Sequence, residues 1–157
     1  MDSTDLAIVA ELMQKGRLSW AELAARVGLS SPGLIDRIRR LEEKGVIRGY
    51  SALIAPEALG LDLTAFLLVA IEKPVQRGGF LKRIRSLSEV QECHQVTGEF
   101  DYLLKLRARD TRHLDQLING ELKGMAGIRR VQVTVALSTE KETPVLPLPM
   151  LPESESA

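Results

Sequence analysis

Apolar positions in the first fifty residues fall into three short blocks at helical spacing. The first block predicts a helix over residues 5–15, and its apolar positions are Leu6, Val9, Leu12 and Met13. The second block opens on a capping box at Ser19 and closes at Gly28, which can take the positive φ that ends a helix. The third opens with Ser31 as the predicted N-cap and Pro32 at the first helical position. Its buried stripe is predicted to be Leu34, Ile38 and Leu41.

Residues 19–44 therefore predict a helix-turn-helix, in which the second helix enters the major groove of DNA. We expect Gly33, Asp36, Arg37 and Arg40 on the outer face of this helix, with Arg39 nearer its flank. Arginines placed there reach base edges or phosphates, and a serine at the helix N-terminus binds a phosphate. The residues predicted to contact double-stranded DNA are Ser31, Gly33, Asp36, Arg37, Arg40, Lys44 and Arg48.

A solvated helical hairpin is the simpler alternative, because charged residues on a helix usually face water. The caps, the Gly-Leu-Ser turn, the proline and the apolar stripe stand in register, and this favours DNA binding. Residues 31–48 hold five basic and three acidic residues. Because this excess is modest, we expect that DNA binding needs more than one such unit.

From Leu63 onward the pattern changes to that of an α+β domain. Strands are predicted over 63–72, 89–97, 101–107 and 128–138. Helices are predicted over 79–87 and between Asp110 and Gly127. The order βαββαβ is that of a ferredoxin-like domain.

The predicted fold class is α+β, with an N-terminal winged helix-turn-helix followed by a C-terminal ferredoxin-like βαββαβ domain. A short strand over 46–50 would close the first domain. The predicted division is 1–50 for DNA binding, 51–62 as a linker with a helical turn, 63–142 for the second domain and 143–157 as a Pro-rich tail.

The segment Leu63–Ile71 (LTAFLLVAI) is apolar on nearly both faces, although a ferredoxin-like sheet carries helices on one face only. A strand of this kind is usually covered on both sides. We expect a second subunit to cover the other face, so that a homodimer presents two recognition helices to two half-sites. The alternative is that the helix-turn-helix domain of the same chain covers it.

The composition of the chain limits which partners, metal sites and cellular locations are expected. The chain has 21 basic and 21 acidic residues, so nucleic-acid binding must rest on a local patch. Cys93 is the single cysteine, which excludes a disulfide framework or a cysteine-rich metal site within one chain. The chain shows no secretory segment and no apolar run long enough to span a bilayer, which favours the cytoplasm and no membrane partner. No cofactor is expected.

Two segments carry a resemblance to a known family. They are RLSWAELAARVGLSSPGLIDRIRRLEEKGVIRGY, from Arg17 to Tyr50, and GEFDYLLKL, from Gly98 to Leu106, with Asp5 ahead of both. In this order and spacing the chain resembles the Lrp/AsnC family, the feast/famine transcriptional regulators. The resemblance implies a dimeric winged-helix regulator, assembled into rings of dimers such as an octamer.

The resemblance also implies that the C-terminal domain binds an amino acid at interfaces between dimers, near the turn after the second strand. The candidate effector-binding residues are Gly98, Glu99, Asp101 and Tyr102. Backbone N–H groups near Gly98 suit a carboxylate, and Asp101 suits an α-ammonium group. The alternative is that Gly98 is only the positive-φ residue of a hairpin and Asp101 a turn cap.

Two other function classes remain open. Sirohaem decarboxylases share this two-domain layout, but their C-terminal hairpin carries an aromatic- and His-bearing segment. Here the segment reads ECHQVTGEFDYLLKL, with His94 as its one histidine, and His113 is expected to be exposed in the first turn of a helix. With no second histidine to support a metal or an acid–base pair, we expect no enzyme. The other class is an assembly protein, either a sensor that has lost DNA binding or an effector-independent DNA-binding protein.

Overall fold

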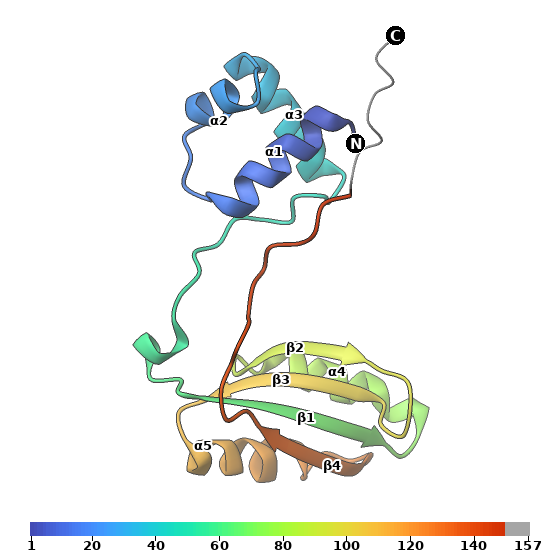
Figure 1. The fold of residues 1–157 in the computed structure, drawn as a ribbon. Helices are drawn as coiled ribbons and strands as arrows, with labels where there is room; N and C mark the ends of the chain where they lie inside the picture. Colours follow the sequence, from blue (N-terminus) through green and yellow to red (C-terminus); the bar gives the residue numbers. More distant parts are fainter. Residues whose placement is uncertain (150–157) are drawn as a thin grey trace. The chain divides into compact units, whose positions relative to one another are not determined.

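A computed structural model of the chain describes residues 1–149 (Figure 1). Its contacts divide the chain into two compact units. Among the described residues, the N-terminal unit is Met1–Leu53 together with residues 141–149, and the C-terminal unit is Ile54–Glu140. The end of the predicted Pro-rich tail, 150–157, lies outside the described residues, and residues 136–149 contain no helix or strand.

Three helices form the N-terminal unit: α1 (Ser3–Gln14), α2 (Trp20–Arg26) and α3 (Ser31–Glu43). Their apolar stripes meet in one core, made of Ile8, Leu23, Ala24, Leu34, Ile38 and Leu41. The stripe predicted for the third helix is confirmed. The stripe predicted for the first helix missed Ile8, which is fully buried.

The capping residues set where these helices begin and end. Ser19 Oγ accepts a hydrogen bond from the Glu22 N–H at 3.2 Å, as the predicted capping box requires. The N-cap of α3, however, is Ser30 and not Ser31: Ser30 Oγ accepts from the Gly33 N–H at 3.3 Å. The predicted cap was one residue late. Pro32 is tolerated at the second helical position because the N–H groups of a first helical turn have no partner within the helix.

The short strand predicted over 46–50 is wrong. After α3 the chain turns at Gly45, where φ is +68°, and the Val46 and Ile47 N–H groups both donate to the Leu41 carbonyl. The segment that follows is coil. Val46 and Ile47 suit a strand, but the described part of this unit holds no second strand with which to pair.

The C-terminal unit is a four-stranded antiparallel sheet with the order β2-β3-β1-β4 (Figure 1). The strands are β1 (Leu63–Ile71), β2 (Val90–Gln95), β3 (Tyr102–Ala108) and β4 (Ile128–Val135). The predicted βαββαβ order is confirmed. The predicted linker holds the short 3₁₀ helix η1 (Pro56–Leu59), which is the helical turn expected there.

The two crossover helices differ from their predicted bounds. Helix α4 (Arg77–Ser86) follows the 3₁₀ turn η2 (Pro74–Gln76) and begins two residues earlier than expected. Asp110 caps α5 (Thr111–Gln116) as predicted, but the helix then widens into the π-helical segment η3 (Leu117–Leu122). Asn119 and Gly120 lie in this wider segment, and both are poor helix formers.

One face of the sheet packs against these helices. Its core residues are Ala65, Leu67, Val69, Phe80, Ile84, Tyr102, Leu104, Leu106, Ala108, Leu114, Ile118 and Leu122. The strand register places the alternate residues on the opposite face, which we call the open sheet face and define by Phe66, Leu68, Leu103, Lys105, Gln132 and Thr134. Phe66, in the central strand, is 37% exposed there. No helix in residues 1–149 is both long and apolar enough to cross a bilayer.

Candidate nucleic-acid interface and effector turn

The arginines of α3 differ in how far they face solvent. The side chains of Arg39 and Arg40 are 68% and 57% exposed, whereas that of Arg37 is 27% exposed. This reverses the predicted placement of Arg37 and Arg39. Arg37 precedes the buried Leu41 by four residues, which puts it only about 40° around the helix from the apolar stripe. Arg39 and Arg40 are therefore the outward-facing arginines of the recognition helix.

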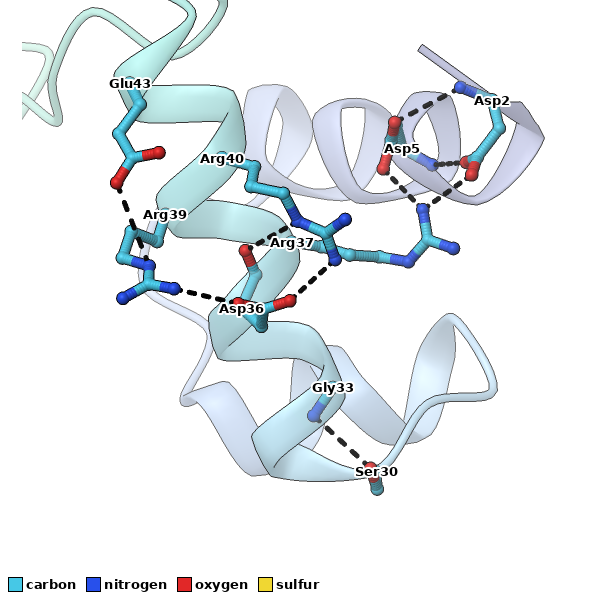
Figure 2. A network of polar contacts seen from close by, with 9 residues as sticks. All are labelled: Asp2, Asp5, Ser30, Gly33, Asp36, Arg37, Arg39, Arg40 and Glu43. Atoms are coloured by element: carbon cyan, nitrogen blue, oxygen red, sulfur yellow. Dashed lines mark hydrogen bonds and ion pairs between the residues drawn. The ribbon is translucent and has the colours of Figure 1, made fainter.

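Asp36 brings these two arginines together on the outer face (Figure 2). Its carboxylate accepts hydrogen bonds from Arg40 Nη2 at 2.7 Å and from Arg39 Nη2 at 3.1 Å. The Nε of Arg40 also donates to the Asp36 carbonyl oxygen at 3.3 Å, and Arg39 lies 3.9 Å from Glu43. Two guanidinium groups are thus held side by side along the exposed surface of α3.

Arg37 points the other way, toward the start of α1 (Figure 2). Its Nη1 donates to Asp2 Oδ2 at 2.6 Å and to Asp5 Oδ1 at 2.7 Å. The hydrogen bond from Arg37 lowers the pKa of Asp2 below its ordinary value, and the two carboxylates raise the pKa of Arg37. Sequence reasoning missed this triad, because no local pattern joins residues 32 and 35 positions apart.

The remaining predicted DNA contacts lie around the same helix. Ser31 is the first residue of α3 and is exposed. A Cβ on Gly33 would lie 3.2 Å from Ser30 Oγ, so glycine at this position leaves room for the N-cap side chain of Ser30. Lys44 is the C-cap of α3, and Arg48 is exposed in the coil beyond it. A hollow of about 340 Å³ is lined by Asp2, Asp5, Arg37, Arg40 and Lys44, among others.

The predicted effector turn joins β2 to β3, and Gly98 takes a φ of +112° there. Asp101 is held inward: its Oδ2 accepts from the Ile71 N–H at 2.8 Å, and its Oδ1 accepts from Arg77 at 3.0 Å. The Nε of Arg77 is buried without a hydrogen-bond partner among residues 1–149. Arg77 was not among the predicted site residues, since it lies 24 residues before Asp101.

Two other residues predicted for the effector site, Glu99 and Tyr102, differ in exposure to solvent. Glu99 is exposed and accepts a hydrogen bond from Arg130 at 2.8 Å, while the Arg130 guanidinium lies 5.2 Å from the centre of the Phe100 ring. Tyr102 is only 4% exposed and packs against Phe80 in the core, with ring centres 4.9 Å apart. The structure therefore brings Gly98, Glu99 and Asp101 to the turn and places the Tyr102 ring inside the domain.

The two histidines have different partners. His94 is exposed and lies 3.1 Å from Glu92. His113 was expected to be exposed, but its side chain is largely buried, and its Nδ1 accepts from the Arg109 N–H at 3.2 Å. Within the part of the chain that the structure describes, no group of three or more His, Cys, Asp or Glu residues is placed to hold a metal ion.

The fold is that of a two-domain protein in which a helix-turn-helix unit precedes a ferredoxin-like unit. Comparisons with known proteins identify the family to which this chain belongs. Residues 1–48 match the winged helix-turn-helix DNA-binding family, and residues 64–146 match the Lrp/AsnC ligand binding domain. The chain belongs to the Lrp/AsnC family of transcriptional regulators. The predicted fold class is thereby confirmed in both of its domains.

Several named proteins are similar to this chain along nearly its whole length. The leucine-responsive regulatory protein of Haemophilus influenzae is 38% identical over 154 residues, which are 94% of this chain and 90% of that protein. A transcriptional regulator of Neisseria meningitidis, solved as a complex with L-Met, has a TM-score of 0.88 and 35% identity over 94% of this chain and 96% of its own. The feast or famine regulatory protein of M. tuberculosis, complexed with L-methionine, has a TM-score of 0.85 and 36% identity. The match covers 92% of this chain and 97% of that protein.

Proposed function

We propose that this regulator reads DNA through the outer face of α3, with Arg40 and Arg39 as the principal base- or phosphate-contacting side chains. The observation that carries this proposal is the pair of exposed guanidinium groups held together by Asp36. Lys44 and Arg48 follow at the end of the helix and suit phosphates of the DNA backbone. Ser31 and Gly33, at the start of the helix, are close enough to its N-terminus for backbone N–H groups to meet a phosphate.

The test is a selection of duplexes from a random pool by the purified protein, followed by binding of the selected duplex to variants. Arg40→Ala should lower affinity for the selected duplex about tenfold or more, because one arginine contact to a base is worth about 1–3 kcal/mol. Arg112→Ala removes an exposed arginine from α5 and serves as the matched control. Equal binding by Arg40→Ala and Arg112→Ala would exclude the assigned face.

We also propose that the protein is a homodimer formed through the open sheet face, with larger assemblies of dimers such as an octamer. Phe66 and Leu68 of β1 supply the apolar part of this face, and Leu103 of β3 lies beside Leu68 in the strand register. An apolar patch in the centre of a sheet face, with polar residues at its edge, is typical of an interface. Dimerisation also doubles the small basic excess of one recognition helix.

The proposed effector is an amino acid bound beside the β2–β3 turn. Two similar regulators were solved with L-methionine, which supports this class of ligand. Gly98 and Glu99 lie at the exposed turn, and Asp101 and Arg77 supply opposite charges next to it. Binding of radiolabelled or calorimetrically titrated amino acids to the wild-type protein, and to Asp101→Ala, tests the assignment.

We infer that the effector acts by changing how dimers assemble, and hence which half-sites are held together. The proposal places the protein in the cytoplasm, together with its DNA. It includes no catalytic step, in keeping with a family of transcriptional regulators. A sirohaem decarboxylase-like activity is the alternative, and a Soret band in the purified protein would favour it.

A further inference from the structure

The ion pair between α1 and α3 stands apart from the other charge contacts of the recognition helix. Asp36 and Glu43 are partners of Arg39 and Arg40 within α3 itself, whereas Arg37 reaches across to Asp2 and Asp5 on a different helix. Asp5 is the most enclosed of these carboxylates, with 18% of its side chain exposed. The three residues therefore tie the start of α1 to the middle of α3.

The geometry argues against Arg37 as a direct DNA contact. A single nitrogen, Nη1, donates to both carboxylates, at 2.6 Å and 2.7 Å. Charge-assisted hydrogen bonds of this length are among the strongest in proteins. A phosphate approaching the Nη2 or Nε donors of Arg37 would meet the exposed carboxylate of Asp2 beside them, and the two negative charges would repel each other. Two carboxylates already offset the charge of Arg37, and this reduces its attraction to a phosphate.

We propose that Asp2, Asp5 and Arg37 form a clamp that positions the recognition helix for DNA, so that Arg37 is a positioning residue and not a reader of DNA. This inference rests on the proposed function. The apolar stripe of Leu34, Ile38 and Leu41 holds α3 in place, but hydrophobic contacts are non-directional and permit a small rotation. The directional hydrogen bonds of the clamp remove that rotation.

Position matters because Arg40 follows Arg37 by one helical turn and lines the same hollow. A binding constellation must be held within about 0.5 Å of its productive geometry to work. A rotation of α3 about its axis would move the Arg40 and Arg39 guanidinium groups together, since Asp36 joins them. The clamp thus acts on sequence selectivity and not on general attraction to DNA.

For the variant Asp5→Asn, the clamp and the net charge predict changes in DNA affinity of opposite sign. Asp5→Asn removes a negative charge from the DNA-binding domain, which by charge alone would strengthen binding. The clamp instead predicts that Asp5→Asn weakens binding to the selected duplex. Asp5 is the N3 residue of the α1 capping box, where its carboxylate accepts from the Asp2 N–H at 3.2 Å. Asparagine has the shape of aspartate, and its amide oxygen can accept the same hydrogen bond, so the start of α1 is preserved. Asp2→Asn is a milder second variant, since Asp2 is more exposed.

The experiment compares wild type, Asp5→Asn, Asp2→Asn, Arg37→Gln and the double variant Asp5→Asn/Arg37→Gln. Each is titrated with the duplex selected from a random pool by the wild-type protein, and with an unrelated duplex of equal length, over a range of salt concentrations. Glu11→Gln is the matched control, because Glu11 is also on α1 but pairs with Arg26 of α2 at 3.2 Å. Melting curves confirm that each variant is folded at the temperature of the assay.

Affinity for the selected duplex should fall about five- to tenfold in Asp5→Asn and Arg37→Gln, the scale of one mismatched base pair. Affinity for the unrelated duplex and the salt dependence should stay unchanged, Glu11→Gln should bind like wild type, and the double variant should be no worse than Arg37→Gln alone.

Three results would overturn the clamp. Stronger binding of both duplexes by Asp5→Asn would show that the carboxylates only repel DNA. A smaller salt dependence in Arg37→Gln alone would show a phosphate contact. An unchanged ratio of the two affinities, in variants that melt at lower temperature, would show a role in stability only. Failure of the wild type to select any duplex would instead overturn the proposed function itself.

Discussion

Arg40 donates from Nη2 to the carboxylate of Asp36 at 2.7 Å and from Nε to its carbonyl oxygen, so one residue fixes the guanidinium at two points. Asp36 lies one turn before Arg40 on α3, and the same carboxylate also holds Arg39. An acidic residue in the middle of the proposed DNA-binding face of α3 thus has a structural role. It orients two arginines and limits their attraction to any phosphate.

Asp36→Asn should make binding stronger and less selective. The substitution frees Arg39 and Arg40 from a carboxylate, and both become available to phosphates at any sequence. Affinity for unrelated DNA should rise by up to about fivefold, which is the range of an exposed ion pair. Fluorescence anisotropy with selected and unrelated duplexes measures both affinities, with Glu57→Gln in η1 as a control of equal charge change. A fall in both affinities would show that Asp36 itself contacts DNA.

The carboxyl group of Asp2 should titrate below its ordinary value of 3.8. The main cause is the hydrogen bond from Arg37, which favours the ionised form. Since the pKa is lower in the folded protein, the stabilisation is present above about 3.8 and is lost as pH falls through the folded value. NMR titration of the carboxyl carbon measures this pKa in wild type and Arg37→Gln. The variant should return the pKa toward 3.8; an identical pKa in both proteins would mean that the pair does not form in solution.

Asp101→Asn should destabilise the C-terminal unit and blunt the response to an amino acid. Its carboxylate accepts from a backbone N–H of β1 and from Arg77, so the change weakens two contacts at once. We expect a loss of about 1–3 kcal/mol in the free energy of unfolding. Glu99→Gln is the control, because its pair with Arg130 is exposed and should be worth under about 1 kcal/mol. Urea unfolding compares them, and equal stability of the two variants would contradict the structural role of Asp101.

Phe66→Glu should dissociate the proposed dimer. The substitution places a charge in the centre of the open sheet face, where a partner would have to bury it without a counter-ion. Light scattering with size-exclusion chromatography should report a monomer for Phe66→Glu. Val75→Glu, at an exposed residue of η2, is the control and should keep the mass of the wild type. An unchanged mass for Phe66→Glu would move the interface away from this face.

Local chemistry made much of the fold predictable. The capping box at Ser19, the positive φ at Gly28 and the stripe from Leu34 to Leu41 all depend on residues within a few positions of each other. The βαββαβ order followed in the same way from alternation and helical spacing. The strand predicted over 46–50 failed because strand formation depends on a partner, which local sequence does not reveal.

The candidate sites were less predictable, because they depend on contacts between distant residues. Helical spacing placed Arg37 on α3 but not its partners Asp2 and Asp5, more than thirty positions away. Likewise, the resemblance to a family placed Tyr102 in a binding turn, whereas strand alternation puts its ring beside Phe80 in the core. Exposure on a helix or strand is decided by the neighbouring element, which becomes known only with the fold.

The most direct test of the account is a gel shift of the wild-type protein on a duplex selected by it from a random pool, with unrelated DNA as competitor and with or without a mixture of amino acids. We expect a specific complex that resists the competitor, weakens steeply with salt and changes in mobility or affinity when amino acids are added. Recovery of no preferred duplex after repeated selection would contradict it.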